Sequence, residues 1–466
     1  MRAWSRLALG VVVAAVLTGC LATLAPVDLD DFFDPAAAER FPERNPVIVI
    51  PGFLGSRLVD AESGRVVWGE VGGGYAAPDT PEGARVIARS LRDDVPSPDV
   101  RPDGVLDHLR FRKVSLRLRP YFKILHTLSA AGYRDEDLSR RLDDDFEGQH
   151  LNSFQFDYDW RLDNAANARR LHAFIRDKTS YCRRQRQLHG QPEKAIRFDV
   201  IAHSMGGLLT RYYLRYGPQP LPEDGSLPEL TWEGTRHIAR VILVAPPNAG
   251  AIKPAVNLIE GVRHGPGFPF YDPLLNGTFP SGYQLLARSR DGAYVDARDP
   301  SRALEDFLDP ELWERHGWGL AAPDKDTLLQ WLLPDVSDHA SRRQIALAYQ
   351  RRMLRLADQF QRALDLPARP PAGTELFLLA GDTMPTPATL AVDPETGGVV
   401  VQGYGPGDGS VLRSSAMATP ASAADPQPAI RWRNIVFIDR KHSRMALDPV
   451  FADRVVYWLL EAKRDS

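Results

Sequence analysis

Short β-favouring runs alternate with longer amphipathic runs between about residues 47 and 245 of the chain. The short runs are rich in apolar residues, which is typical of strands buried on both faces of a sheet. The longer runs repeat their apolar residues at helical spacing. We therefore expect strands at 47–50, 154–158, 198–201 and 238–245, and helices at 121–131, from about 162 to 186, and from 205 onward. This alternation predicts the α/β class, with a mostly parallel central sheet and helices on both faces.

The alternation stops after residue 250. Residues 251–372 hold aromatic and proline-rich loops and one long amphipathic helix, at about 341–364. Strand-like runs then return at 376–380 and 435–438. The simplest organisation is one sheet domain in two parts with an inserted cap between them. The three predicted segments are a first core part at 43–250, a cap at 251–372 and a second core part at 373–466.

Composition and charge change this picture little, but they exclude several classes of protein. The chain has 466 residues, of which 44% are hydrophobic and 25% charged, and its formal net charge is −3. This composition is that of an ordinary globular protein without a basic surface, so no nucleic-acid partner is expected. Zinc-finger, P-loop, dinucleotide-binding and metal-ligand spacings are missing from the sequence, so neither a cofactor nor a metal is expected. The sequence leaves the oligomeric state open.

The N-terminus has the pattern of an export signal. Arg2 and Arg6 precede an apolar run at 7–17, whose eleven residues are too few to span a bilayer. The run ends in Leu-Thr-Gly-Cys20, which resembles a bacterial lipoprotein box. The resemblance implies cleavage after a signal peptide at 1–19, lipid attachment at Cys20 and a tether at 20–42. We therefore expect an exported, membrane-anchored lipoprotein of the bacterial cell envelope; the alternative is a plain secretory signal with an incidental cysteine.

Ser204 lies at the corner between a predicted strand and a predicted helix. The surrounding sequence Ala-His-Ser-Met-Gly at 202–206 matches the G-x-S-x-G elbow, with alanine in its first position. Small residues are needed there because the turn is sharp, and the turn exposes the serine oxygen above a helix N-terminus. Serine is also a common helix cap, which is the alternative interpretation. The adjacent His203 leaves the elbow in another direction, so we expect it to be structural.

A nucleophilic serine needs a base, and the base needs an orienting carboxylate. In α/β-hydrolases both lie at strand ends, in the chain order serine, acid, histidine. His442 follows the last predicted strand and is the only histidine after position 339. Asp408 lies between glycines in a loop before that strand, whereas Asp382 is the rival and Asp439 a weaker one. We therefore expect Ser204, Asp408 and His442 to form the catalytic triad.

Two backbone N–H groups usually bind the oxyanion in such a site. One comes from the residue after the nucleophile, here Met205, and the other from a loop after an early strand. Phe53 follows Pro51-Gly52 directly after the strand predicted at 47–50, so it is the expected second donor. Since the donors are backbone groups, neither side chain has to be polar.

These motifs, taken in order, resemble the lecithin:cholesterol acyltransferase family, which includes the lysosomal phospholipase. The resemblance extends from about 46 to 450 and is thin across 251–372. The segments that carry it are Pro51–Ser56, Tyr158–Arg161, Ala202–Gly206, Gly407–Ser410 and His442, together with Ala131–Tyr133 and Gly381–Thr386.

The resemblance implies an α/β-hydrolase fold with Ser204, Asp408 and His442 as the triad and Phe53 and Met205 as oxyanion donors. It further implies attack on phospholipid or other lipid acyl esters, with the acyl group passed to water or to a lipid alcohol. Trp68 resembles a tryptophan near the acyl pocket of the family, but it could equally be a core aromatic. The disulfides of the animal members cannot form in this chain, and the divergent cap leaves the acceptor open.

We therefore expect a serine-dependent lipid ester hydrolase or O-acyltransferase, with hydrolysis as its main activity. The alternative enzyme is a plain lipase or carboxylesterase that never transfers its acyl group. The alternative of another class is a non-catalytic lipid-binding lipoprotein on a hydrolase scaffold.

Overall fold

A six-stranded sheet forms the centre of the molecule. The computed structural model describes residues 44–71, 75–106, 108–111, 114–117, 119–135, 151–265, 268–419 and 430–462. The strand order is β17-β14-β10-β9-β1-β8, and every neighbouring pair is parallel, which confirms the expected parallel sheet. The strands are β1 (Val47–Ile50), β8 (Ser153–Gln155), β9 (Phe198–His203), β10 (Ile238–Val244), β14 (Glu375–Ala380) and β17 (Asn434–Phe437).

Helices cover both faces of this sheet, as the sequence pattern predicts. On β1, Ile48 and Ile50 point into one apolar cluster, whereas Val47 and Val49 point into another. This alternation is the period of two that strands impose on their side chains. The first cluster includes residues of α6 (Asn164–Leu188) and α7 (Met205–Tyr216). The second includes residues of α4 (Arg119–Ala130) and α15 (Pro449–Leu460).

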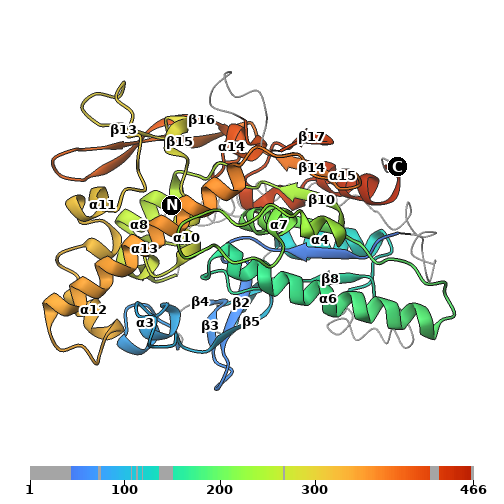
Figure 1. The fold of residues 1–466 in the computed structure, drawn as a ribbon, viewed down its shortest axis with the longest axis horizontal. Helices are drawn as coiled ribbons and strands as arrows, with labels where there is room; N and C mark the ends of the chain where they lie inside the picture. Colours follow the sequence, from blue (N-terminus) through green and yellow to red (C-terminus); the bar gives the residue numbers. More distant parts are fainter. Residues whose placement is uncertain are drawn as a thin grey trace, which may run out of the picture.

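The stretch between β10 and β14 is mainly helical. Its longest helix, α13 (His339–Asp365), runs beside α10 (Pro280–Gln284), as Figure 1 shows. The other elements of the stretch are α8 (Lys253–Glu260), β11 (Val262–Arg263), β12 (Phe270–Tyr271), α9 (Pro273–Asn276), η2 (Ser289–Asp291), β13 (Tyr294–Asp296), α11 (Pro310–His316), η3 (Gly319–Ala321) and α12 (Asp326–Leu332). The elements outside this stretch are β2 (Ser56–Asp60), β3 (Val66–Trp68), β4 (Glu70–Val71), α3 (Pro81–Ile87), β5 (Val100–Val105), β6 (His108–Phe111), β7 (Val114–Arg117), η1 (Glu233–Arg236), α14 (Arg413–Met417) and η4 (His442–Leu447).

A long hairpin that the sequence pattern did not predict lies between β14 and β17. Its strands are β15 (Met384–Val392) and β16 (Val399–Gly407), and β13 pairs with β15 in parallel to complete a three-stranded sheet. Figure 1 shows this small sheet at one end of the molecule. Pro385 and Pro387 interrupt the strand-like pattern of β15, but they lie where β15 pairs only with β16 and next to a shift in register, and proline is tolerated at such edges and bulges. The hairpin ends immediately before Asp408.

The C-terminal end of α13 is bound by α7, the helix that follows Ser204. The last carbonyl groups of any helix lack partners within that helix. Here the Tyr216 hydroxyl donates to the Ala363 carbonyl at 2.7 Å, and Arg211 donates to the Leu364 carbonyl at 2.8 Å. Arg215 donates to the carbonyl of Leu366, the residue that follows the helix. These three hydrogen bonds therefore fix the end of α13 to the helix that carries the elbow.

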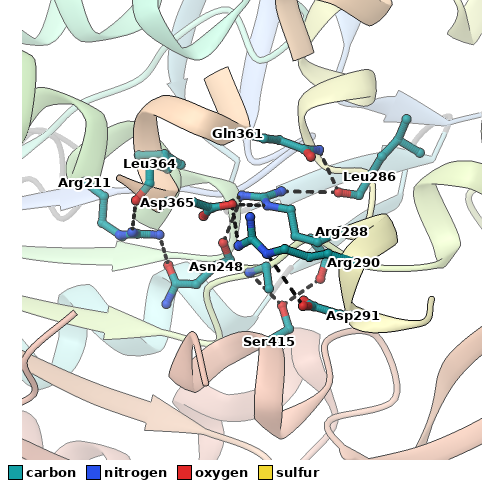
Figure 2. Close-up of polar contacts among 12 residues, drawn as sticks. Arg211, Asn248, Leu286, Arg288, Arg290, Asp291, Gln361, Leu364, Asp365 and Ser415 are labelled. Atoms are coloured by element: carbon teal, nitrogen blue, oxygen red, sulfur yellow. Dashed lines mark hydrogen bonds and ion pairs between the residues drawn. The ribbon is translucent and has the colours of Figure 1, made fainter. Parts of the chain in front are cut away.

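A buried polar cluster surrounds this joint (Figure 2). The carboxylate of Asp365 accepts a hydrogen bond from Arg288 at 2.7 Å and one from Arg290 at 2.8 Å. Burial opposes the ionisation of Asp365, but these guanidinium groups outweigh it and hold its pKa below the usual range. Asn248, in the loop after β10, accepts from Arg211 at 3.1 Å, so the loop belongs to the same cluster.

The predicted lipidation site, Cys20, and its flanking segments 1–19 and 20–42 lie outside the described residues. Over the described part of the chain, no helix has the length and apolar character that a membrane span requires. Cys182 is buried on α6, and burial raises the pKa of its thiol to about 12.

Candidate active site

Ser204 lies in a strained turn between β9 and α7. Its φ is 53° and its ψ is −124°, a backbone conformation that side-chain-bearing residues rarely adopt. The two glycines that follow have little space: a β-carbon at Gly206 would overlap the Pro51 carbonyl oxygen, and one at Gly207 would lie 2.9 Å from Pro246. The motif therefore carries glycine where the elbow packs against the loop after β1.

His442 links Ser204 to Asp408. Its Nε2 lies 2.9 Å from the Ser204 hydroxyl oxygen, and its Nδ1 lies 2.7 Å from Oδ2 of Asp408. The His442 backbone N–H also donates to the Asp408 carbonyl at 2.9 Å, which fixes the two residues to each other twice. When Nδ1–H donates to the carboxylate, Nε2 is left as the acceptor for the serine proton.

The Asp408 side chain is almost fully buried, with 2% of the residue exposed. Its Oδ1 accepts the backbone N–H groups of Ser410 at 2.8 Å and Val411 at 2.7 Å. Burial opposes ionisation, but His442 and these two donors outweigh it, so the pKa of Asp408 lies below its ordinary value. A buried carboxylate that stays ionised can stabilise a positive charge on the imidazole.

The rival acids lie elsewhere. Within the described residues, no hydrogen bond joins Asp382 or Asp439 to His442, and Asp439 instead accepts the Thr383 hydroxyl. Gly381, next to Asp382, lies directly against Asp408, because a β-carbon there would be 2.6 Å from that of Asp408. The structure therefore brings Asp408, and neither rival, to the histidine.

Hydrogen bonds to its backbone groups fix the loop at 51–55, between β1 and β2, which we call the Phe53 loop. Tyr158 donates its hydroxyl to the Pro51 carbonyl at 2.9 Å, and the Trp68 indole donates to the Leu54 carbonyl at 2.9 Å. The Gly55 N–H donates to the Gly52 carbonyl at 2.9 Å. These contacts hold the loop in one conformation beside the elbow.

Two N–H groups remain available at this place. Among the described residues, none accepts a hydrogen bond from the N–H of Phe53 or from that of Met205, the first residue of α7. Met205 follows Ser204 directly, and the elbow touches the Phe53 loop through Gly206 and Pro51. Fixed, unpaired backbone donors next to a nucleophile can stabilise an oxyanion.

Trp68 lies in a cluster of aromatic rings beside this loop. Only 5% of Trp68 is exposed, and its ring centre lies 5.5 Å from Trp160, 5.4 Å from His264 and 5.8 Å from Phe268. Trp160 in turn lies 4.9 Å from the ring of Phe53. Burial lowers the pKa of His264 to about 4, so this histidine is neutral at neutral pH. The surroundings of the Phe53 loop on this side are therefore apolar and aromatic.

The sequence did not reveal two residues behind the site. Tyr121, on α4, contacts both Gly52 and His203, and His203 contacts the backbone of His442. Tyr121 carries no sequence signal beyond its helical periodicity, and His203 was expected to be merely structural. In the described segments, no group of three or more His, Cys, Asp or Glu side chains is arranged to hold a metal ion.

Comparison with known proteins bears on the family of this site. Residues 88–286 match the lecithin:cholesterol acyltransferase family. This match confirms the resemblance that the motifs indicate. It contains Ser204 but ends before Asp408 and His442, which are brought to the serine by the fold. A search of curated proteins found no match.

One solved structure supports the fold, and two others align with lower scores. The structure of the Tle4–Tli4 complex superposes with a TM-score of 0.53 at 14% sequence identity, over 90% of this chain and 98% of that chain. Together with the parallel sheet and its flanking helices, this confirms the α/β-hydrolase fold. The lipase BlEst2 of Bacillus licheniformis, in its propeptide form, aligns at 11% identity and TM-score 0.32, over 92% of this chain and 53% of that one. Phospholipase PlaB of Legionella pneumophila aligns at 15% identity and TM-score 0.20, over 54% and 38% of the two chains.

Proposed function

We propose that the protein is a serine-dependent lipid ester hydrolase that works through an acyl-Ser204 intermediate. The observation that carries the proposal is the chain of hydrogen bonds from Ser204 through His442 to the buried Asp408, at 2.9 and 2.7 Å. A helix cap, the competing interpretation of Ser204, receives no support from the structure, because the Ser204 side chain makes no capping hydrogen bond to α7. The strained backbone of Ser204 is also typical of a nucleophile elbow.

The reaction follows from the directions of these bonds. His442 Nε2 takes the proton from the Ser204 hydroxyl as its oxygen attacks the ester carbonyl carbon. The carbonyl oxygen becomes an oxyanion and accepts the N–H groups of Phe53 and Met205. The imidazolium, stabilised by Asp408, then protonates the leaving alcohol, and the acyl group stays on Ser204. In the second half, His442 deprotonates a water molecule as its oxygen attacks the acyl carbon, and the imidazolium then returns this proton to Ser204 as the bond to the acyl group breaks and the carboxylic acid leaves.

The proposed substrate class is a lipid acyl ester, with phospholipid as the first candidate. The aromatic cluster around Trp68 supports it, since an acyl chain would find apolar contacts there, and so does the family match. Tle4 was solved with Tli4 and PlaB is called a phospholipase, but neither name extends to this chain. Hydrolysis is the proposed main reaction. Transfer to a lipid alcohol needs no further group, because His442 would deprotonate an alcohol as it does water.

The decisive experiment compares wild type with Ser204→Ala. A fluorophosphonate probe should label wild type once per chain and leave the variant unlabelled, and phospholipid vesicles should yield free fatty acid with wild type only. A wild-type protein that resists the probe while binding vesicles would instead be a non-catalytic lipid-binding protein. Vesicles with and without a sterol or long-chain alcohol then separate the two reactions: free fatty acid alone, at full phospholipid turnover, identifies a hydrolase without transferase activity.

We further propose that the chain is exported and anchored to the bacterial envelope by lipid on Cys20. The support is the Leu-Thr-Gly-Cys sequence behind a charged start and a short apolar run. Such an anchor would hold the enzyme at a membrane, where phospholipid is concentrated.

A further inference from the structure

Behind the triad, two side chains connect the Phe53 loop to the backbone of the general base. The Tyr121 hydroxyl oxygen lies 2.9 Å from the Gly52 nitrogen and 3.0 Å from Nδ1 of His203. On its other side, Nε2 of His203 lies 3.3 Å from the carbonyl oxygen of His442. The two imidazole rings are close, with centres 5.0 Å apart. A continuous series of hydrogen bonds thus runs from Gly52 to His442; we call it the Tyr121–His203 link.

The chemistry of the groups fixes the direction of every bond in the link. A carbonyl oxygen can only accept, so Nε2 of His203 must carry a hydrogen and donate to His442. In a neutral imidazole the other nitrogen is then an acceptor, so Nδ1 takes the Tyr121 O–H. The Tyr121 oxygen in turn accepts the Gly52 N–H. Each donor has one acceptor, and no member can be reversed alone.

The environment keeps these directions in place. Burial, together with the neighbouring His442, lowers the pKa of His203 to about 3, so the ring stays neutral over the working range of an esterase. Tyr121 is 8% exposed, and burial raises the pKa of its hydroxyl, so it stays protonated as well. Neither residue therefore changes its charge during the reaction.

Two glycines make room for the link. A β-carbon at Gly52 would lie 3.3 Å from Nδ1 of His203, and one at Gly55 would lie 2.8 Å from the Tyr121 hydroxyl oxygen. The Phe53 loop is thus built to approach Tyr121 and His203 closely. Glycine is therefore needed at these two positions because of close packing, which is a different reason from the sharp turns where glycine is usually found.

We propose that Tyr121 and His203 are positioning residues that hold the Phe53 loop and the His442 main chain at a fixed distance from each other. The proposal rests on the proposed esterase function. A positional error of about 1 Å in a catalytic group can cost about a hundredfold in rate, so a rigid tie between the base and an oxyanion donor matters. Neither side chain needs to contact the substrate, because each acts through a backbone group.

The test uses purified full-length protein, a soluble 4-nitrophenyl butanoate substrate and active sites counted with the fluorophosphonate probe. Tyr121→Phe removes only the hydroxyl, and His203→Leu removes both ring nitrogens. Each variant should lower kcat about tenfold to a hundredfold, the range expected when an oxyanion site is misaligned, with KM within about twofold of wild type. The double variant should lose no more than the worse single variant, because both changes break the same link.

Two further variants complete the design. Tyr216→Phe is the matched control: its buried hydroxyl also donates a hydrogen bond, at 2.7 Å to the Ala363 carbonyl, but it is outside the link, so kcat should stay at the wild-type value. His203→Gln keeps a side-chain amide that can donate to His442, so it should recover part of the kcat lost in His203→Leu.

The outcomes separate this inference from the proposed function. If Tyr121→Phe and His203→Leu kept wild-type kcat per active site and only lowered the melting temperature, the link would be structural and the inference wrong. Multiplicative losses in the double variant would also overturn it, because the residues would then act independently. Activity that survives Ser204→Ala would instead refute the esterase mechanism, whatever the link variants do.

Discussion

Gly52 lies so close to Ser204 that a β-carbon added to the glycine would be 2.8 Å from the β-carbon of the serine. Carbon atoms that are not bonded prefer separations of about 3.5–4.0 Å, so any side chain at this position must displace the elbow or the Phe53 loop. Gly52, the residue before the proposed oxyanion donor Phe53, thus packs directly against the proposed nucleophile, and it can do so because it has no side chain. Their spacing is therefore set by backbone packing.

Gly52→Ala should consequently lower kcat by about a hundredfold or more, since a shift of about 1 Å in a reacting group has that effect. The matched control is Gly282→Ala on α10, where a β-carbon would meet nothing closer than 3.8 Å. Steady-state kinetics on a soluble ester, with circular dichroism as a check of folding, measure both. Equal kcat values for the two variants would mean that the Phe53 loop and the elbow can move apart without loss of activity.

Asp408→Asn should damage catalysis far more than Asp382→Asn. An amide at 408 cannot stabilise the imidazolium and favours the wrong tautomer of His442, a change that lowers kcat by about 10⁴-fold in a comparable triad. Asp382→Asn removes a carboxylate that makes no hydrogen bond to His442 in the described structure, so it should leave kcat near the wild-type value. The reverse ranking in single-turnover acylation rates would transfer the acid role to Asp382.

Asp365→Asn should reduce the free energy of unfolding at neutral pH by about 3 kcal/mol, because it leaves buried Arg288 without its countercharge. The pKa of Asp365 is lowered in the folded state, so the unfolded state binds more protons and the stabilisation is present above the unfolded pKa of about 3.9. It is lost as the pH falls through the lower folded value. In urea unfolding, the difference in the free energy of unfolding between wild type and Asp365→Asn should therefore become smaller below about pH 4.

The control for this prediction is Asp358→Asn. Asp358 pairs with Arg362 on the exposed side of α13, with about half of each side chain accessible. An exposed pair of this kind contributes only about 0.3–0.5 kcal/mol, so the variant should unfold almost like wild type. If both variants lost the same free energy of unfolding, the buried Asp365 would stabilise the protein no more than an exposed ion pair does.

Cys20→Ala should abolish lipid attachment and processing by the lipoprotein signal peptidase. Mass spectrometry of the N-terminal peptide should find the lipidated cysteine in wild type and an uncleaved signal in the variant, and detergent-phase partitioning should be lost with it. More than one acyl chain is needed for a stable anchor, since one chain binds membranes only marginally. Wild-type protein recovered without lipid, with its N-terminus elsewhere, would contradict the assignment.

Much of the fold could be predicted because the central strands carry an unambiguous pattern. Val47–Ile50 has the predicted bounds, the predicted strand at 376–380 differs from β14 by one residue at its start, and the predicted strand at 435–438 differs from β17 by one residue at each end. Buried parallel strands are apolar on both faces, so a short run of branched residues identifies them from local sequence alone. The hairpin of β15 and β16 has no such run, since prolines, glycines and the exposed Val400 interrupt its pattern, and its further partner β13, which pairs with residues 390–392, is remote in sequence.

The three residues of the proposed triad could be named from the sequence because their chemistry is local. Each is a reactive residue close to a strand end, and Ser204 and Asp408 also have alanine or glycine within two positions in the sequence. Tyr121 could not, because its hydroxyl gains a purpose only when α4 packs on the sheet and brings it to Gly52 and His203. A role that depends on three segments separated by 69 and 82 residues has no signature in any one of them.

The hydrogen bonds from α7 to the end of α13 restrict how the segment between β10 and β14 could be exchanged in protein engineering. Arg211, Arg215 and Tyr216 belong to α7, which starts directly after Ser204, and each donates a hydrogen bond to a carbonyl group at the end of α13 or just after it. A grafted segment that ended elsewhere would remove the carbonyl acceptors that α13 and the residue after it offer to the buried Arg211 and Arg215. Chimeras should therefore keep the last turn of α13 and place their junction before it, so that only the parts distant from this joint are free to diversify.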